Sequence, residues 1–148
     1  RVLPARRWRL APAELVEQLA VALAEPPAAA SAELRLVPQR QLRKMNSQLR
    51  DIGERTDAEL VHAHPADAPG LADGDEIVLR SPFGATTGVL HLDDTIARGA
   101  VALPHGWART NVCALTDTDE GVDPHTGMVW QAGIPVTIHA APASAHER

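Results

Sequence analysis

The chain has 148 residues, of which 45% are hydrophobic and 22% charged, and its formal net charge is −5. This composition is typical of a globular domain with a core, and the longest apolar run, residues 19–24, is too short to span a membrane. The single cysteine excludes an internal disulfide and a multi-cysteine zinc site, and we expect Cys113 to be a small buried hydrophobic residue. The single cysteine and the lack of a signal-peptide pattern lead us to expect a cytoplasmic location. We also expect no membrane insertion.

Charge is unevenly distributed along the chain. Residues 1–50 carry nine basic and four acidic groups, whereas residues 51–148 carry five basic and fifteen acidic groups. A nucleic-acid-binding protein usually has a broad basic face with aromatic groups, but here the basic cluster is confined to residues 35–50 and aromatic residues are few. We therefore expect no nucleic-acid binding, and a single anionic ligand held by a few arginines is the more plausible use of this cluster.

Residues 1–32 are predicted to form a helical segment and a linker. Pro12 suits the first position of a helix, and the low-complexity stretch 26–32, which begins with two prolines, ends it. We expect this helix to dock on another domain. Its apolar stripe consists of Leu15, Leu19, Ala22 and Leu23.

Six strands are predicted between residues 33 and 141, because their residues alternate or are rich in β-branched side chains and turn residues bound them. Asp73-Gly74-Asp75 is a predicted turn and Pro82-Phe83-Gly84 a predicted hairpin turn. Residues 66–71 can form one turn of helix that ends near Gly70. The predicted strands are residues 34–38, 59–64, 76–81, 86–92, 100–103 and 134–140. Residues 142–148 are predicted to be a disordered tail.

Two connections between these strands are candidates for ligand contact. Residues 39–51 contain Arg40 and the pair Asn46-Ser47 among other basic residues. Their guanidinium, amide and hydroxyl groups could bind a phosphate or a polar heterocycle, although a solvated helical turn is the alternative. Residues 108–133 lack periodicity and are rich in Asp, Thr and Gly, so we expect a long loop without a core of its own that is either functional or disordered.

His62 and His64 raise the question of a metal site. On a strand they would point to the same face, where both could reach one ion. A third ligand would have to come from beyond Pro65, and two histidines on a strand face are common without a metal. We therefore predict no metal site here.

Several short motifs follow one another in a specific order. Each is weak alone, but their order and spacing are specific. They are Pro-x-Asp-Ala with Gly-Leu-x-Asp-Gly-Asp at 65–75, Ser-x-x-Gly at 81–84, Arg-Gly-x-Val at 98–101, Leu-Pro-His-Gly-Trp at 103–107, Leu-Thr-Asp at 115–117 and Asp-Pro-x-Thr-Gly at 123–127. Through them, residues 34–140 resemble the C-terminal molybdopterin dinucleotide-binding domain of the molybdopterin oxidoreductases, the family of formate dehydrogenases and nitrate reductases.

The resemblance implies a mainly β fold, a six-stranded double-psi β-barrel of the aspartate-decarboxylase-like type, with short helices and an N-terminal helical appendage. Residues 1–32 would form the appendage and linker, residues 33–141 the barrel, and residues 142–148 the tail.

The resemblance also implies a function. Such a domain closes over molybdopterin guanine dinucleotide, whose molybdenum or tungsten is ligated outside this domain, with the remaining domains of the parent oxidoreductase as partners. We expect no catalysis by the isolated domain. The cofactor-binding residues implied by position are Arg40, Asn46, Ser47, His105, Gly106, Trp107, Asn111, Thr116 and Asp117.

The sequence departs from the family pattern at one point. Members often have Asn-x-Leu-Thr where this chain has Cys113-Ala114-Leu115-Thr116, and Asn111 is then the candidate to replace the missing amide.

Two alternative functions use the same barrel. A self-processing aspartate decarboxylase usually needs Gly-Ser, which does not occur here. A peptide- or adaptor-binding module without cofactor is the other, but it leaves the Leu-Pro-His-Gly-Trp loop without a role.

Overall fold

The computed structural model describes residue 8 and residues 10–24, 34–41, 59–124 and 126–142. The chain divides into two compact units, Arg1–Ser31 and Ala32–Arg148. The predicted linker at 26–32, most of the predicted tail, and the candidate residues Asn46 and Ser47 lie outside the described residues.

The first unit contains the predicted helix, α1, which spans Ala13–Ala24. Pro12 precedes it, and the Pro12 carbonyl accepts hydrogen bonds from the backbone N–H groups of Leu15 and Val16 at 3.1 Å. None of its residues is buried, and Leu19 and Leu23 are 58% and 76% exposed. Within the described parts of the chain, no helix is long and apolar enough to cross a membrane.

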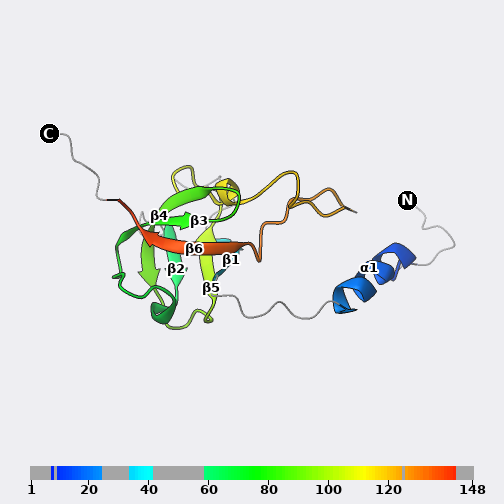
Figure 1. The fold of residues 1–148 in the computed structure, drawn as a ribbon, viewed down its shortest axis with the longest axis horizontal. Coiled ribbons are helices and arrows are strands. Elements are labelled where there is room, and N and C mark those ends of the chain that lie inside the picture. Colours follow the sequence, from blue (N-terminus) through cyan, green and yellow to red (C-terminus); the bar gives the residue numbers. More distant parts are fainter. Residues whose placement is uncertain (1–7, 9, 25–33, 42–58, 125, 143–148) are drawn as a thin grey trace. The chain divides into compact units, whose positions relative to one another are not determined.

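The second unit is a barrel of six strands, as the sequence predicts (Figure 1). Each observed strand lies within one or two residues of its predicted position. The strands are β1 (Leu34–Gln39), β2 (Leu60–Ala63), β3 (Glu76–Arg80), β4 (Ala85–Leu92), β5 (Ala100–Pro104) and β6 (Pro135–Ala140).

The barrel is closed in the order β1-β5-β2-β4-β3-β6, with β6 returning to β1. Two pairs are parallel, β1 with β5 and β2 with β4, and the other neighbours are antiparallel. Two parallel pairs in a closed six-stranded barrel agree with the predicted double-psi fold. Closure leaves every strand paired on both sides, which removes the exposed edges that an open sheet has.

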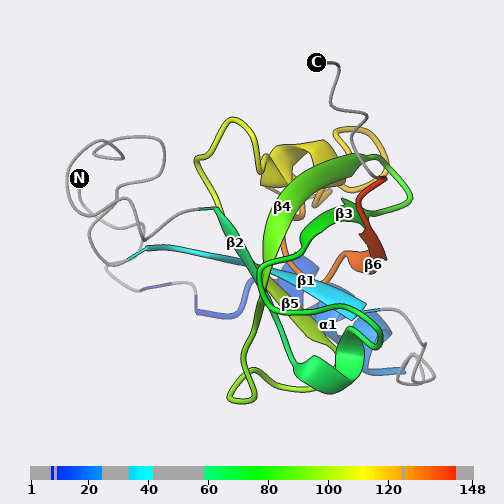
Figure 2. The same ribbon diagram turned by 90° about the vertical axis from the view of Figure 1, so that its left-hand side faces the viewer.

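Two short 3-10 helices lie on opposite sides of the barrel, η3 (Pro65–Asp67) and η4 (Val112–Leu115) (Figure 2). The first is the helical turn predicted before Gly70. The second lies in the segment predicted to be a loop without periodicity, and it buries Val112 and Leu115 against the barrel. The long segment therefore contributes to the barrel's core, although it forms none of its own.

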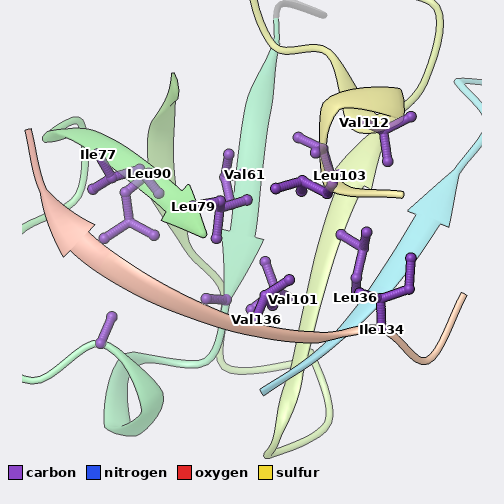
Figure 3. Close-up of a cluster of buried hydrophobic side chains, with 13 residues drawn as sticks. Leu36, Val61, Ile77, Leu79, Leu90, Val101, Leu103, Val112, Ile134 and Val136 are labelled. Carbon is purple, nitrogen blue, oxygen red and sulfur yellow. The ribbon is translucent and has the colours of Figure 1, made fainter. Parts of the chain in front are cut away.

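The core consists of aliphatic side chains that point inward from the strands (Figure 3). Alternation places Ile77 and Leu79 of β3 inside the barrel, as expected for a strand with one face in water. Strand β5 is different, because four successive residues, Val101–Pro104, are buried. The strand is therefore covered on both faces, which is why its sequence is a continuous apolar run. The fully buried large side chains are mainly Leu36, Val61, Ile77, Leu79, Leu90, Leu103 and Leu115.

Candidate functional site

The ends of the parallel strands β1 and β5 meet at one edge of the barrel, and the residues that follow them form the candidate site. In the register of these strands, Gln39 lies opposite Pro104. The backbone N–H of His105 donates to the carbonyl of Gln39 at 3.3 Å, which extends the pairing by one residue. Because parallel strands end at the same edge, Arg40 and His105 come together although they are far apart in the sequence.

A cavity of about 530 Å³ opens at this edge, and we call it the β1/β5 pocket. Its lining residues are Pro38, Arg40, His105, Gly106, Val112, Cys113 and Gln131. They supply a guanidinium, an imidazole, a thiol and an amide beside apolar walls. Such a combination suits a ligand that has both polar and apolar parts.

The residues on either side of the pocket are tied to each other. The indole N–H of Trp107 donates to Oε1 of Gln41 at 3.0 Å, so the segment after β5 is attached to the segment after β1. Gly106 has a φ of +92°, a conformation that other residues adopt only with strain. The glycine between His105 and Trp107 thus allows the turn that directs these two side chains.

The chain beyond Trp107 is anchored on β2 and β4 by hydrogen bonds. Thr110 is fully buried, and both its backbone N–H and its hydroxyl donate to Oε2 of Glu59, at 3.2 and 2.9 Å. The next backbone N–H, that of Asn111, donates to the hydroxyl of Thr86 at 2.9 Å. These bonds determine where η4 begins, and η4 in turn places Val112 and Cys113 at the β1/β5 pocket.

Asn111 and Thr116 are placed at the two ends of η4. Oδ1 of Asn111 accepts a hydrogen bond from the backbone N–H of Cys113 at 3.1 Å, as an N-cap does. The hydroxyl of Thr116 donates to the carbonyl of Cys113 at 2.9 Å. Asn111 lines a different cavity, of about 290 Å³, and neither residue lines the β1/β5 pocket.

Asp117 also lies apart from the β1/β5 pocket. Its Oδ2 accepts hydrogen bonds from the backbone N–H groups of Glu120 at 2.6 Å and Gly121 at 3.3 Å. The Glu120 N–H, helped by its neighbours, lowers the pKa of the Asp117 carboxyl from its usual value. The carboxylate thus folds its own loop, and it lines a third cavity.

Two of the motifs that carry the family resemblance turn out to be partners of each other. Asp67 belongs to the Pro-x-Asp-Ala motif, and its Oδ1 accepts a hydrogen bond from Nε of Arg98 at 2.8 Å. Its Oδ2 accepts one from the backbone N–H of Gly99 at 2.6 Å, so the Arg-Gly motif binds this carboxylate twice. These motifs hold the barrel together and do not line the β1/β5 pocket.

The two histidines considered as metal ligands serve different purposes. Nδ1 of His64 accepts a hydrogen bond from the backbone N–H of Ala66 and caps η3. The ring of His62 contacts that of His91 edge to face, with centroids 5.0 Å apart. Burial lowers the pKa of His62, His91 lowers it further, and Asp93 opposes this. No group of three metal-ligating side chains occurs within the described parts of the chain.

Sequence reasoning missed some of the pocket and was wrong about one residue. Gln131 lines the pocket but lies in the segment without periodicity, where no local pattern distinguishes it. Cys113 was expected to be buried, yet it is exposed and lines the pocket, because η4 buries its neighbour Val112 instead. Of the predicted site residues, the structure brings Arg40, His105 and Gly106 together in this pocket, with Trp107 beside it.

Comparison with known proteins identifies the family of the chain. Among solved structures, the chain is similar to acetylene hydratase from Pelobacter acetylenicus, with 21% identity and a TM-score of 0.66. The match covers 74% of this chain and only 18% of that one, so the chain spans a small part of that protein's length. A search of curated proteins found no match. Residues 34–133 match the family described as the molydopterin dinucleotide binding domain, and the chain therefore belongs to this family.

Proposed function

We propose that the β1/β5 pocket binds the pterin part of a molybdopterin guanine dinucleotide, and that the chain is the cofactor-closing domain of a larger molybdenum or tungsten oxidoreductase. The observation that supports this most is the meeting of Arg40 and His105 in one pocket at the ends of two parallel strands. When bound, the cofactor supplies the redox-active metal centre, whose ligands we place outside this domain. The chain's own task is to bind and orient the cofactor.

The pocket fits this ligand in size and in chemistry. Its volume, about 530 Å³, lies within the range of small-molecule sites. A pterin is a flat ring with an amide-like edge, which the side-chain amide of Gln131 can pair with, while Pro38 and Val112 cover its faces. Arg40 is suited to a phosphate oxygen and His105 to a ring nitrogen or oxygen.

The remaining predicted residues have supporting roles in this proposal. Asn111 and Thr116 position η4 through the hydrogen bonds at its two ends. Trp107 holds the segment after β5 through its bond to Gln41. Asn46 and Ser47 follow Arg40 in the sequence, and we retain them as candidate contacts to phosphate.

Equilibrium dialysis of the 148-residue chain against 6-hydroxymethylpterin tests this proposal. We expect a Kd around millimolar, because the full cofactor is enclosed by several domains. Arg40→Ala and His105→Ala should each weaken binding by about fivefold. Arg80→Ala and His139→Ala are matched controls, since both residues are exposed on other strands, and they should leave the affinity unchanged.

Equal affinity in all four variants would contradict the assignment of the pocket. Saturable binding of unrelated peptides by a chain that binds neither pterin nor GDP would favour the adaptor-module alternative.

A further inference from the structure

A second cavity lies beside the irregular segment at residues 130–133. Gln131 lines the β1/β5 pocket, whereas its neighbours Trp130 and Ala132 line a cavity of about 340 Å³. We call this cavity the Trp130 pocket. It shares no lining residue with the β1/β5 pocket.

Two aromatic side chains are left exposed at the Trp130 pocket. Phe83 is 43% exposed and Trp130 is 56% exposed, although the chain has one phenylalanine and no tyrosine. The backbone N–H of Trp130 donates to the Gly121 carbonyl at 2.8 Å, and a bridge between Val122 and Val129 closes the loop that carries it. This loop extends away from the barrel between η4 and β6 (Figure 1). Both aromatic side chains are thus accessible to a ligand, and Trp130 is carried by a hydrogen-bonded loop.

Carboxylates of the same loop also line the pocket. Asp117 and Glu120 both reach it, and backbone N–H groups keep the Asp117 carboxyl in its charged form. Arg35, the cation among the lining residues, already donates from Nη1 to the Gly133 carbonyl at 3.1 Å. Residues 34–41 and 59–142 of the barrel unit carry eleven carboxylates and five arginines, a net charge of −6. The electrostatic field of this part of the chain therefore favours a cation.

From these features we propose that the Trp130 pocket is a docking site for an arginine side chain of a partner protein segment. A guanidinium stacks flat on an indole or phenyl ring, and its fork of N–H groups can bind a carboxylate at the same time. An apolar side chain would fill the volume but would offer no hydrogen-bond donor to the two carboxylates. An anionic side chain would be repelled by Asp117 and Glu120.

Titration of the 148-residue chain with the peptide acetyl-Gly-Arg-Gly-amide tests this inference, with the Trp130 indole and Gly133 amide signals followed by NMR. We expect saturable shifts with a Kd on the order of 10 mM. The matched ligand is the same peptide with citrulline, a neutral isostere of arginine, and it should bind at least about fivefold more weakly. Equal shifts from both peptides, or no saturable shift below about 100 mM arginine peptide, would overturn the proposal.

Variants locate the interaction. Trp130→Leu should weaken arginine-peptide binding about fivefold and Glu120→Gln about threefold. Met128→Ala is the control, because Met128 is a 68% exposed side chain of the same loop that does not line the pocket. Unchanged affinity in both Trp130→Leu and Glu120→Gln would overturn the assignment. Pterin binding should survive these variants, so this inference and the proposed function can fail independently.

Discussion

At the scale of single residues, Asp67 shows how one carboxylate can join distant parts of the barrel. Its side chain is only 7% exposed and binds the Arg98 side chain and the Gly99 backbone. Burial alone would raise its pKa, but the bonds from Gly99 and Arg98 outweigh this and lower the pKa of Asp67. The carboxylate is therefore more stable as an anion in the folded barrel than in the unfolded chain.

We predict that Asp67→Asn lowers the free energy of unfolding by about 2 kcal/mol at neutral pH, because an amide cannot accept both bonds. A lowered pKa gives stability that is present above the unfolded value of 3.8 and is lost as the pH falls through the folded value. The difference in unfolding free energy between the wild type and Asp67→Asn should thus shrink in acid. Urea denaturation at several pH values measures this difference, and Asp94→Asn, a change at an exposed residue, is the control. A difference that persists in acid would contradict this account.

At the scale of elements, η4 is the piece whose position decides the shape of the candidate site. Hydrogen bonds that Thr110 and Asn111 donate to Glu59 and Thr86 fix the chain just before it. The hairpin turn between β3 and β4 fixes its far end, since a Cβ on Gly84 would clash with the Ala114 carbonyl oxygen. The Ser-x-x-Gly motif thus needs glycine for close approach to η4.

Gly84→Ala should therefore displace η4. We expect a loss of about 2 kcal/mol in the free energy of unfolding, and a changed rate of reaction of the exposed Cys113 thiol with a disulfide reagent. Gly70→Ala is the control, because Gly70 has a φ of +82° and open space around it. Gly70→Ala should lower the free energy of unfolding by about 1 kcal/mol through backbone strain and leave the reaction rate of the Cys113 thiol unchanged. If Gly84→Ala has the stability and thiol reactivity of the wild type, the contact between Gly84 and the Ala114 carbonyl oxygen is not tight.

The contact between β2 and β4 predicts a pH effect. Residues His62 and His91 are paired in the parallel register of these strands. Since burial and His91 lower the pKa of His62, the folded state binds this proton less tightly than the unfolded chain, and stability is lost as the pH falls below 6.5. His62→Gln should lose less stability than the wild type between about pH 8 and about pH 5. Urea midpoints at both pH values measure this, with the exposed His139→Gln as control. An unchanged pH dependence would contradict it.

Much of this level of structure could be predicted from local sequence. Strands and turns were found because alternation and glycine placement are local, as the φ of +89° at Gly74 illustrates. The 3-10 helix η4 was not predicted, because four residues with two buried side chains are too few to show a periodic pattern. In the site, Arg40 was a candidate from its basic cluster as well as from the resemblance, and His105 came from the resemblance. Gln131 reaches them through a loop whose path no local pattern fixes.

At the scale of the whole molecule, closure of the barrel creates the site. The pairing of β1 with β5 joins residues near position 38 to residues near position 103, and alternation alone cannot predict such a pairing. The fold was therefore inferred from the family resemblance, which the match over residues 34–133 confirms. Because the two strands are parallel, one edge of the barrel collects both of the segments that follow them.

NMR mapping of pterin binding tests the central claim, that this edge binds the cofactor, most directly. The 148-residue chain would be titrated with 6-hydroxymethylpterin and separately with GMP, and the backbone amide shifts compared. The account predicts that the pterin shifts cluster at Arg40, His105, Gly106, Cys113 and Gln131. Pterin shifts that saturate but cluster around Asn111 or Trp130, and leave the β1/β5 pocket unchanged, would contradict it.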